Sequence, residues 1–401
     1  MGRRIDCWFD YTCPYAYLAS LRVEDVCART GDALTWRPML LGGVFRAHGT
    51  PQKLFATVSP QKAAHTARDL QRQAEALGVA LRFPAEHPLR AVEALRVTLA
   101  TGNDPRVIHG FYRAYWVEGR AISAPETLAA VLAEAGYDPE ASAALVHRAH
   151  HDPALKDALR VATDEAVSLG IFGAPSLVID GREMYWGNDR LSLLEDRPAP
   201  VKAHPTMAHT LEVYWDFSSP YAYLGQTQAE ALAARTGATL VWRPMLLGGL
   251  FKTVGQEQVP MRTWSPAKQE HTLRDIGRWA AYWGVPYNFP ELFPVNSVKA
   301  LRCWMALPPE ARDDFRARTF AAYWADGRDI SDEAVLRDLL GPSAEATLAA
   351  TGTPAIKQGL IDATQRAADA GVFGAPTWVV DGTELFWGQD RIPLVEHALS
   401  R

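Results

Sequence analysis

The chain repeats itself. Residues 8–18 read WFDYTCPYAYL, and residues 214–224 read YWDFSSPYAYL, 206 positions later. The block WRPMLLGG at 36–43 recurs at 242–249 with the same offset, and FGAP at 172–175 recurs at 373–376 with an offset of 201. Blocks that recur in one order, with small length changes between them, are typical of duplicated modules whose surface loops differ. The chain must therefore fold as two similar units.

Length agrees with this division, because 401 residues are enough for two domains. We expect one module at 1–195, a linker at 196–209 and a second module at 210–401. The linker has scattered charges, no apolar period and three prolines, which predict an exposed, semi-rigid connector. These prolines are Pro198, Pro200 and Pro205.

Composition excludes several classes of partner. Hydrophobic residues make up 48% and charged residues 22%, as in globular proteins. A net charge of −5 gives no electrostatic surface for nucleic acid, so no nucleic-acid partner is expected. There is no run of eighteen apolar residues to span a membrane, and the first residues lack the apolar core of a secretion signal. These features predict a cytoplasmic protein.

The cysteines do not form a CxxC pair or a metal-ligand spacing, so no metal site is predicted. Only Cys13 lies within a repeated motif, whereas Cys7, Cys27 and Cys303 are replaced in the other copy by Val213, Ala233 and Val97. These exchanges indicate small buried apolar positions.

Each copy has the same predicted order of elements: strand, helix, strand, a helical middle, two strands and a last helix. The first helix should run from Pro14 to Thr30 and from Pro220 to Thr236, starting with a proline and ending at a glycine. Asp180-Gly181 and Asp381-Gly382 predict type I′ hairpins, and the last helices should start at Asp189 and Asp390. The predicted strands of the first copy are Ile5–Asp10, Ala33–Pro38, Ser176–Asp180 and Glu183–Trp186. Those of the second copy are Leu211–Phe217, Thr239–Pro244, Thr377–Asp381 and Glu384–Trp387. The order is that of an α/β thioredoxin-like fold with an all-helical insertion, repeated twice in tandem.

The strand that leads into a Ser-Pro-Tyr helix start, and the tail GVFGAP … DG … FWGQDR, resemble a known family. They are similar to 2-hydroxychromene-2-carboxylate isomerases and kappa-class glutathione transferases, within the wider DsbA-like group. The resemblance covers nearly the whole chain, once in each copy. It implies glutathione as the cofactor.

The two copies differ at the position where the chemistry would be decided. Ser219 stands at a strand end before a helix N-terminus, where N–H groups and the helix dipole stabilise an anion such as a thiolate. The resemblance implies that Ser219 activates the sulfur of glutathione; otherwise it is a plain N-cap. Cys13 occupies the matching place, where a helix N-terminus would depress its pKa, or it merely replaces serine. With Ala16 three residues later, a dithiol cycle is not available.

The resemblance also implies binding positions for glutathione. Ala375 and Ala174 would pair with its cysteinyl part beside Pro376 and Pro175, which the resemblance implies are cis. The pairs Gln389-Asp390 and Asn188-Asp189 would hold the γ-glutamyl end, although an aspartate there is also a good helix cap. Lys268 and Lys62 would face a carboxylate, or belong to a solvated helix face with His271 and Asp275, and with His65 and Asp69. The resemblance places Asn296 near the substrate, where copy one has Arg90, and Tyr221 suits a flat apolar substrate.

We therefore expect a glutathione-dependent isomerase or transferase acting on an aromatic or conjugated carbonyl substrate, with the second copy the better catalyst. Two alternatives remain: a monothiol disulfide oxidoreductase or glutathione-conjugating enzyme centred on Cys13, and a non-catalytic glutathione-binding protein. Relatives of this kind pair as homodimers, and a tandem chain can satisfy that pairing as an internal pseudo-dimer.

Overall fold

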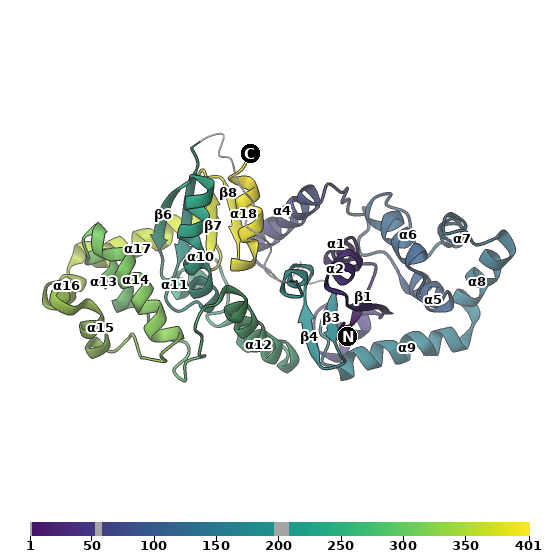
Figure 1. Ribbon diagram of the computed structural model, residues 1–401, viewed down its shortest axis with the longest axis horizontal. Coiled ribbons are helices and arrows are strands. Elements are labelled where there is room, and N and C mark those ends of the chain that lie inside the picture. Colours follow the sequence, from purple (N-terminus) through teal and green to yellow (C-terminus); the bar gives the residue numbers. More distant parts are fainter. Residues whose placement is uncertain (1, 53–57, 196–207) are drawn as a thin grey trace. The chain divides into compact units, whose positions relative to one another are not determined.

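The computed structural model describes residues 2–52, 58–195 and 208–401, so most of the predicted linker lies outside the described residues. The chain folds as two compact units that follow the two sequence copies except for two short segments (Figure 1). Val58–Asp69 of the first copy belongs to unit 2, and Ser265–His271 of the second copy belongs to unit 1. The remainder of unit 1 is Met1–Thr57 and Leu70–Pro198, and the remainder of unit 2 is Ala199–Trp264 and Thr272–Arg401.

The first copy consists of a strand–helix–strand segment, a helical middle and a final β-hairpin followed by a 3₁₀ helix. Its elements are β1 (Arg4–Phe9), α1 (Pro14–Ser20), α2 (Val23–Thr30), β2 (Ala33–Pro38), α3 (Leu41–Ala47), α4 (Pro60–Ala76), α5 (Val92–Ala100), α6 (Pro105–Trp116), α7 (Pro125–Glu134), α8 (Pro139–His151), α9 (Pro153–Ser168), β3 (Ser176–Ile179), β4 (Glu183–Trp186) and the 3₁₀ helix η2 (Asn188–Leu193).

The second copy repeats this order. Its elements are β5 (Thr210–Trp215), α10 (Pro220–Thr236), β6 (Thr239–Pro244), α11 (Leu247–Thr253), η3 (Pro260–Thr263), α12 (Pro266–Trp283), α13 (Val298–Ala306), α14 (Pro309–Trp324), α15 (Glu333–Leu340), η4 (Gly341–Ser343), α16 (Ala344–Thr351), α17 (Pro354–Asp369), β7 (Thr377–Val380), β8 (Glu384–Trp387), η5 (Gln389–Arg391) and α18 (Ile392–Ala398).

Each unit contains one mixed four-stranded sheet. The strand orders are β2-β1-β3-β4 and β6-β5-β7-β8. The first strand of each copy runs parallel to the second and antiparallel to the third, and the last two strands form an antiparallel hairpin. This order, with helices inserted between the second and third strands, confirms the predicted thioredoxin-like fold.

The alternation of side chains along the strands sets the core. Leu211 and Val213 of β5 share a buried cluster with Trp378 of β7 and with residues of α10 and α18, such as Leu232 and Val395. Because successive side chains of a strand point to opposite faces, Glu212 and Tyr214, which alternate with them, face the other side of the sheet. One face of this sheet is therefore covered by α10 and α18.

The first helix of copy one differs from the prediction, because it is broken into α1 and α2. The hydroxyl of Ser20 donates to the carbonyl of Tyr17 at 2.7 Å, a local bond that competes with the helical ladder. The matching residue of the second copy is Gln226, within the single helix α10. Both segments end at left-handed glycines, Gly31 and Gly237, as predicted.

The last element of each copy also corrects the prediction. Copy one ends in a 3₁₀ helix, in which the hydroxyl of Ser192 donates to the carbonyl of Asp189, three residues earlier, at 2.7 Å. In copy two the segment at Asp390 is a short 3₁₀ turn, and the α-helix begins only at Ile392. The Pro393 at its second position fits a helix start, since proline has no N–H to leave unpaired there.

The hairpins and the three other cysteines match the sequence predictions. Asp180, Gly181, Asp381 and Gly382 all have positive φ, as both central residues of a type I′ turn require. Cys7, Cys27 and Cys303 are free and buried.

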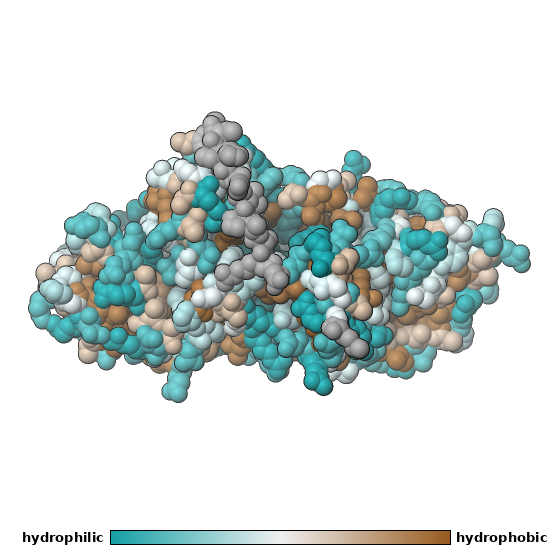
Figure 2. All heavy atoms as spheres, viewed as in Figure 1, coloured by the Kyte–Doolittle hydropathy of each residue, from teal (hydrophilic) through white to brown (hydrophobic). Residues whose placement is uncertain are grey.

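On the face shown in Figure 2, hydrophilic and hydrophobic residues are interspersed. None of the described helices combines the length and apolar composition needed to cross a bilayer.

Candidate active site

Ser219 lies where β5 turns into α10, with Pro220 as the first residue of the helix. Its side chain is 4% exposed. The Oγ atom accepts a hydrogen bond from the N–H of Ala222 at 3.1 Å, and its hydroxyl donates to the carbonyl of Ala375 at 2.9 Å. Ser219 is thus the predicted N-cap, and it also reaches the segment that precedes β7.

Gly225 brings the second turn of α10 against the same segments. A Cβ atom placed on this glycine would lie 3.1 Å from Cγ of Pro376 and 3.5 Å from Cβ of Gln389. The absence of a side chain therefore allows α10, the Ala375-Pro376 segment and η5 to meet at one place. The predicted site residues Ser219, Ala375, Pro376 and Gln389 are together in unit 2.

Both predicted cis peptide bonds are present, at Ala174-Pro175 and Ala375-Pro376. Two further cis bonds, His87-Pro88 and Phe293-Pro294, were not predicted from the sequence.

Asp216, which the sequence analysis did not single out, is fully buried three residues before Ser219. Its carboxylate accepts from the N–H groups of Ser218 at 2.9 Å and Leu247 at 2.6 Å, which ties the turn before α10 to the start of α11. Burial raises the pKa of Asp216 despite these hydrogen bonds. The signal that could have identified Asp216 is its recurrence as Asp10 in the repeated motif of the first copy.

Cys13 occupies the matching place in unit 1 but behaves differently. Its thiol donates to the carbonyl of Ala174 at 3.0 Å, and its side chain makes no cap hydrogen bond. Burial raises the pKa of Cys13 to about 12, although the backbone N–H groups of Ala16 and Tyr15 act in the opposite direction. The depressed pKa expected from the helix N-terminus is therefore wrong, because desolvation of the thiolate outweighs the helix end.

Gln389 offers an unused donor inside unit 2. Its side chain is 1% exposed, and its Oε1 accepts from the indole N–H of Trp283 at 2.6 Å. Because an indole nitrogen only donates, the amide oxygen faces Trp283 and the NH₂ group is turned away. That buried nitrogen has no hydrogen-bond partner in the described part of the chain. A buried donor of this kind fits an acceptor supplied by a ligand.

The equivalent residues of copy one are arranged differently. The amide nitrogen of Asn188 donates to Oε1 of Gln73 at 2.7 Å, so a side chain already occupies it. Asp189 pairs with Arg190 at 2.7 Å, as Asp390 pairs with Arg391 at 3.1 Å. Of the two matching amides, Asn188 and Gln389, only Gln389 therefore has a nitrogen without a partner in the described part of the chain.

The residues Lys62, His65 and Asp69 are not a solvated helix face, which corrects that explanation. In unit 2 the Lys62 ammonium lies 4.9 Å from the centre of the Trp387 ring, and the backbone N–H of Trp387 donates to Nε2 of His65 at 3.2 Å. Asp69, 2% exposed, accepts from Nε of Arg391 at 2.8 Å. Burial lowers the pKa of Lys62. These residues lie beside the tail motif that contains Gln389 and Asp390.

Lys268 and His271 come from the second sequence copy but belong to unit 1. The Lys268 ammonium lies 5.2 Å from the ring centre of Trp186, and the His271 ring lies 5.4 Å from that of Phe172. His271 is 6% and Asp275 2% exposed, so this row is not solvated either.

The two predicted substrate residues have less specific surroundings. Asn296 is exposed, and its Oδ1 accepts from the N–H of Val298 at 3.1 Å, at the start of α13. Its counterpart Arg90 pairs with Glu93 at 2.8 Å. Tyr221 is half-buried in the first turn of α10. Their substrate role stays a prediction.

Each of the two copies is similar to known proteins. Residues 4–198 and 210–400 each match the family model described as a DSBA-like thioredoxin domain. The chain is 33% identical over 205 residues to 2-hydroxychromene-2-carboxylate isomerase of Sphingobium xenophagum, covering 48% of this chain and 99% of that protein. It is 28% identical over 210 residues to glutathione S-transferase kappa 1 of Homo sapiens, covering 48% and 92%.

Among solved structures, a 2-hydroxychromene-2-carboxylate isomerase matches with 26% identity and a TM-score of 0.43, covering 48% of this chain and 94% of that one. In each of these comparisons, one relative corresponds to about half of the present chain.

Proposed function

Because this chain is an enzyme of the DSBA-like thioredoxin domain family, we propose that it is a glutathione-dependent isomerase or transferase whose thiol-activating residue is Ser219. The observation that carries this proposal is the buried hydroxyl of Ser219 at the N-terminus of α10, in contact with the Ala375-Pro376 segment. The relatives named as isomerases and kappa-class transferases support the same activity.

The residues of unit 2 fit glutathione. The buried NH₂ group of Gln389 needs an acceptor, and a γ-glutamyl carboxylate supplies one. Lys62, beside Trp387, supplies a cation for a second carboxylate. We propose that Gln389, Asp390 and Lys62 hold the two ends of glutathione, and that Ala375 pairs with its middle.

Ser219 has the hydrogen needed to stabilise a thiolate. Its hydroxyl now donates to the carbonyl of Ala375, and rotation about the Cβ–Oγ bond would redirect that hydrogen to a sulfur bound nearby. The positive end of the α10 helix dipole also favours a negative charge there. Ser219 would therefore lower the pKa of a bound thiol.

When bound, glutathione would supply a thiolate that adds reversibly to a conjugated carbonyl compound, so that a double bond can rotate and the cofactor is regenerated. The proposed substrate is an aromatic or conjugated carbonyl compound. Tyr221, half-buried one residue beyond Pro220, is suited to contact a flat ring near the thiol.

A pair of matched variants tests the assignment. Ser219→Ala should lower turnover with glutathione about a hundredfold, the typical effect of losing one hydrogen bond to a developing anion. Cys13→Ala is the control at the same place in the other copy, and it should leave turnover nearly unchanged. Loss of turnover in Cys13→Ala alone would contradict the assignment. Saturable glutathione binding without turnover on any conjugated acceptor would instead identify a non-catalytic binding protein.

The oxidoreductase alternative has less support, because a thiol with a pKa of about 12 is almost entirely protonated at neutral pH. A glutathione adduct of Cys13 that forms readily at neutral pH, detected by mass spectrometry, would revive it.

We also propose that the two copies act as an internal pseudo-dimer. Each unit contains a short segment from the other sequence copy, Val58–Asp69 in unit 2 and Ser265–His271 in unit 1. A chain that pairs internally should have the mass of one whole chain, 44.2 kDa, in light scattering. A mass of twice this value at all concentrations would contradict the proposal.

A further inference from the structure

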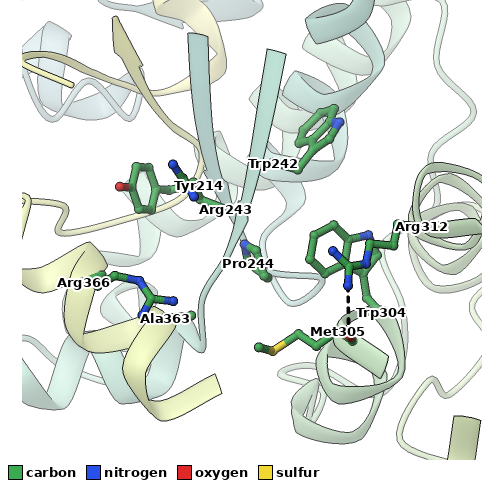
Figure 3. A pocket seen from close by; sticks show the side chains of 9 residues that line it. All are labelled: Tyr214, Trp242, Arg243, Pro244, Trp304, Met305, Arg312, Ala363 and Arg366. Carbon is green, nitrogen blue, oxygen red and sulfur yellow. Dashed lines mark hydrogen bonds between the residues drawn. The ribbon is translucent and has the colours of Figure 1, made fainter. Parts of the chain in front are cut away.

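A pocket of about 340 Å³ lies in unit 2, away from the residues of the proposed glutathione site. None of Ser219, Ala375, Pro376, Gln389 and Asp390 is among its lining residues. It surrounds the end of β6, which is an edge strand of its sheet, and α13, α14 and α17 complete its walls (Figure 3). Its volume is at the lower end of the range for small-molecule sites.

Aromatic rings form much of the pocket wall. Tyr214 comes from β5, Trp242 from β6 and Trp304 from α13 (Figure 3). Trp304 is 6% exposed, and its ring packs edge-on against Trp215 at 5.4 Å. The indole nitrogen of Trp304 is buried and has no hydrogen-bond partner in the described part of the chain. A residue that lines the pocket therefore has a buried donor that needs an acceptor.

Three arginines complete the lining. Arg312 has its guanidinium 4.9 Å from the Trp304 ring centre, and two main-chain carbonyls fix it: that of Leu307 at 2.9 Å and that of Met305 at 3.1 Å. Neither Arg312 nor Arg366 forms an ion pair with a described carboxylate, whereas Arg243 is bound to Glu212. Two positive charges at the pocket are thus uncompensated.

The first copy shows that the fold does not require these groups. Trp304 corresponds to Thr98 by the offset of 206, and Arg366 corresponds to Glu165 by the offset of 201. Counting back from Trp324 and Trp116, Arg312 corresponds to Asp104. Two cationic positions of the second copy are therefore acidic in the first, although the two sheets have the same strand order.

From these contacts we propose that this pocket is a second ligand site, which binds a small aromatic carboxylate. The carboxylate lies between Arg312 and Arg366 and accepts the indole N–H of Trp304, and the ring packs against the aromatic wall. A guanidinium that is already held in place loses little freedom when it binds an anion, which favours a site over a transient surface contact.

Salicylate is a suitable probe, and ligand-observed saturation-transfer NMR on the full chain measures its affinity. Arg366→Glu, which introduces the residue type of copy one at an exposed position, should weaken salicylate binding at least about tenfold, since it removes a charge-assisted hydrogen bond to the carboxylate. Trp304→Phe keeps the ring against Trp215 but removes the N–H, and it should also weaken binding several-fold. The neutral analogue 2-hydroxybenzamide should bind more weakly than salicylate.

Arg318→Glu is the matched control, because Arg318 lies on α14 in the same unit, is exposed and does not line the pocket. It should leave the affinity unchanged. Equal binding to Arg366→Glu and to the unmodified chain would overturn the proposal. Displacement of salicylate by glutathione would place the probe at the thiol site, and equal affinity for inorganic phosphate would show that the ring is not recognised; either result would also overturn it.

Discussion

Replacing Ser219 by alanine should destabilise unit 2 by an amount that follows from its two hydrogen bonds. The first is the cap, in which Oγ accepts from the N–H of Ala222 at 3.1 Å. Loss of a serine N-cap costs about 1 kcal/mol. The second is the donation to the carbonyl of Ala375 at 2.9 Å, in a place where Ser219 is 4% exposed. A buried acceptor left without a partner costs about 1–3 kcal/mol.

These two contributions together predict a loss of about 2–4 kcal/mol in the free energy of unfolding. Chemical denaturation followed by tryptophan fluorescence and circular dichroism measures it on the full chain. Cys13→Ala is the internal control, because Cys13 makes no cap hydrogen bond and keeps only the bond to the Ala174 carbonyl at 3.0 Å.

The control variant should therefore lose about 1 kcal/mol less than Ser219→Ala, the value of the missing cap. A loss below about 0.5 kcal/mol for Ser219→Ala, or an equal loss in the two variants, would refute the reasoning, because the hydrogen bonds at Ser219 would then contribute nothing specific.

Three further perturbations have defined outcomes. The thiol of Cys13 has an ordinary pKa of 9.0 that burial raises to about 12, so the stability gained by keeping it neutral is fully present below pH 9 and is lost as the pH rises towards 12. Relative to Cys13→Ser, the unmodified chain should lose up to about 1.4 kcal/mol per pH unit in that window, as measured by urea denaturation; parallel curves would contradict the burial of the thiol. Gly225→Ala places a methyl group 3.1 Å from Cγ of Pro376 and should lower stability by about 1–3 kcal/mol in thermal melts; an unchanged melting temperature would show that α10 can shift. Thr364→Val removes the acceptor of the Leu246 N–H at 2.9 Å and should lower the free energy of unfolding by about 1 kcal/mol or more. The amide hydrogen of Leu246 should also exchange faster. A variant of unchanged stability would indicate that water replaces the hydroxyl.

Much of the fold follows from local pattern. The apolar segments bounded by turn residues predicted the strand limits to within two residues, and prolines and glycines predicted where the first helical segment of each copy starts and ends, because these signals act over a few neighbouring residues. The break between α1 and α2 did not follow from them. The chain leaves helical geometry at Arg22, where no proline or glycine in the sequence marks a helix end.

The candidate site was predicted in part. The motifs indicated Ser219, Ala375, Pro376 and Gln389, and the structure brings them together through α10 and Gly225. Their roles towards glutathione stay proposals. Asp216 was missed because a buried carboxylate at the end of a strand has no distinctive spacing, and only its hydrogen bonds to two N–H groups show what it does.

The sequence by itself determined that the chain is a tandem duplication, and that one copy has Ser219 where the other has Cys13, because both facts are written in the order of residues. Only the tertiary structure decided how these two groups differ. A helix N-terminus favours an anion wherever it occurs, but burial acts against the thiolate of Cys13 and raises its pKa to about 12. Burial also makes a hydrogen-bond partner more important for the Ser219 hydroxyl and the Gln389 amide, because a buried donor has no water to replace that partner. Burial depends on contacts between residues far apart in the chain, which no local pattern specifies.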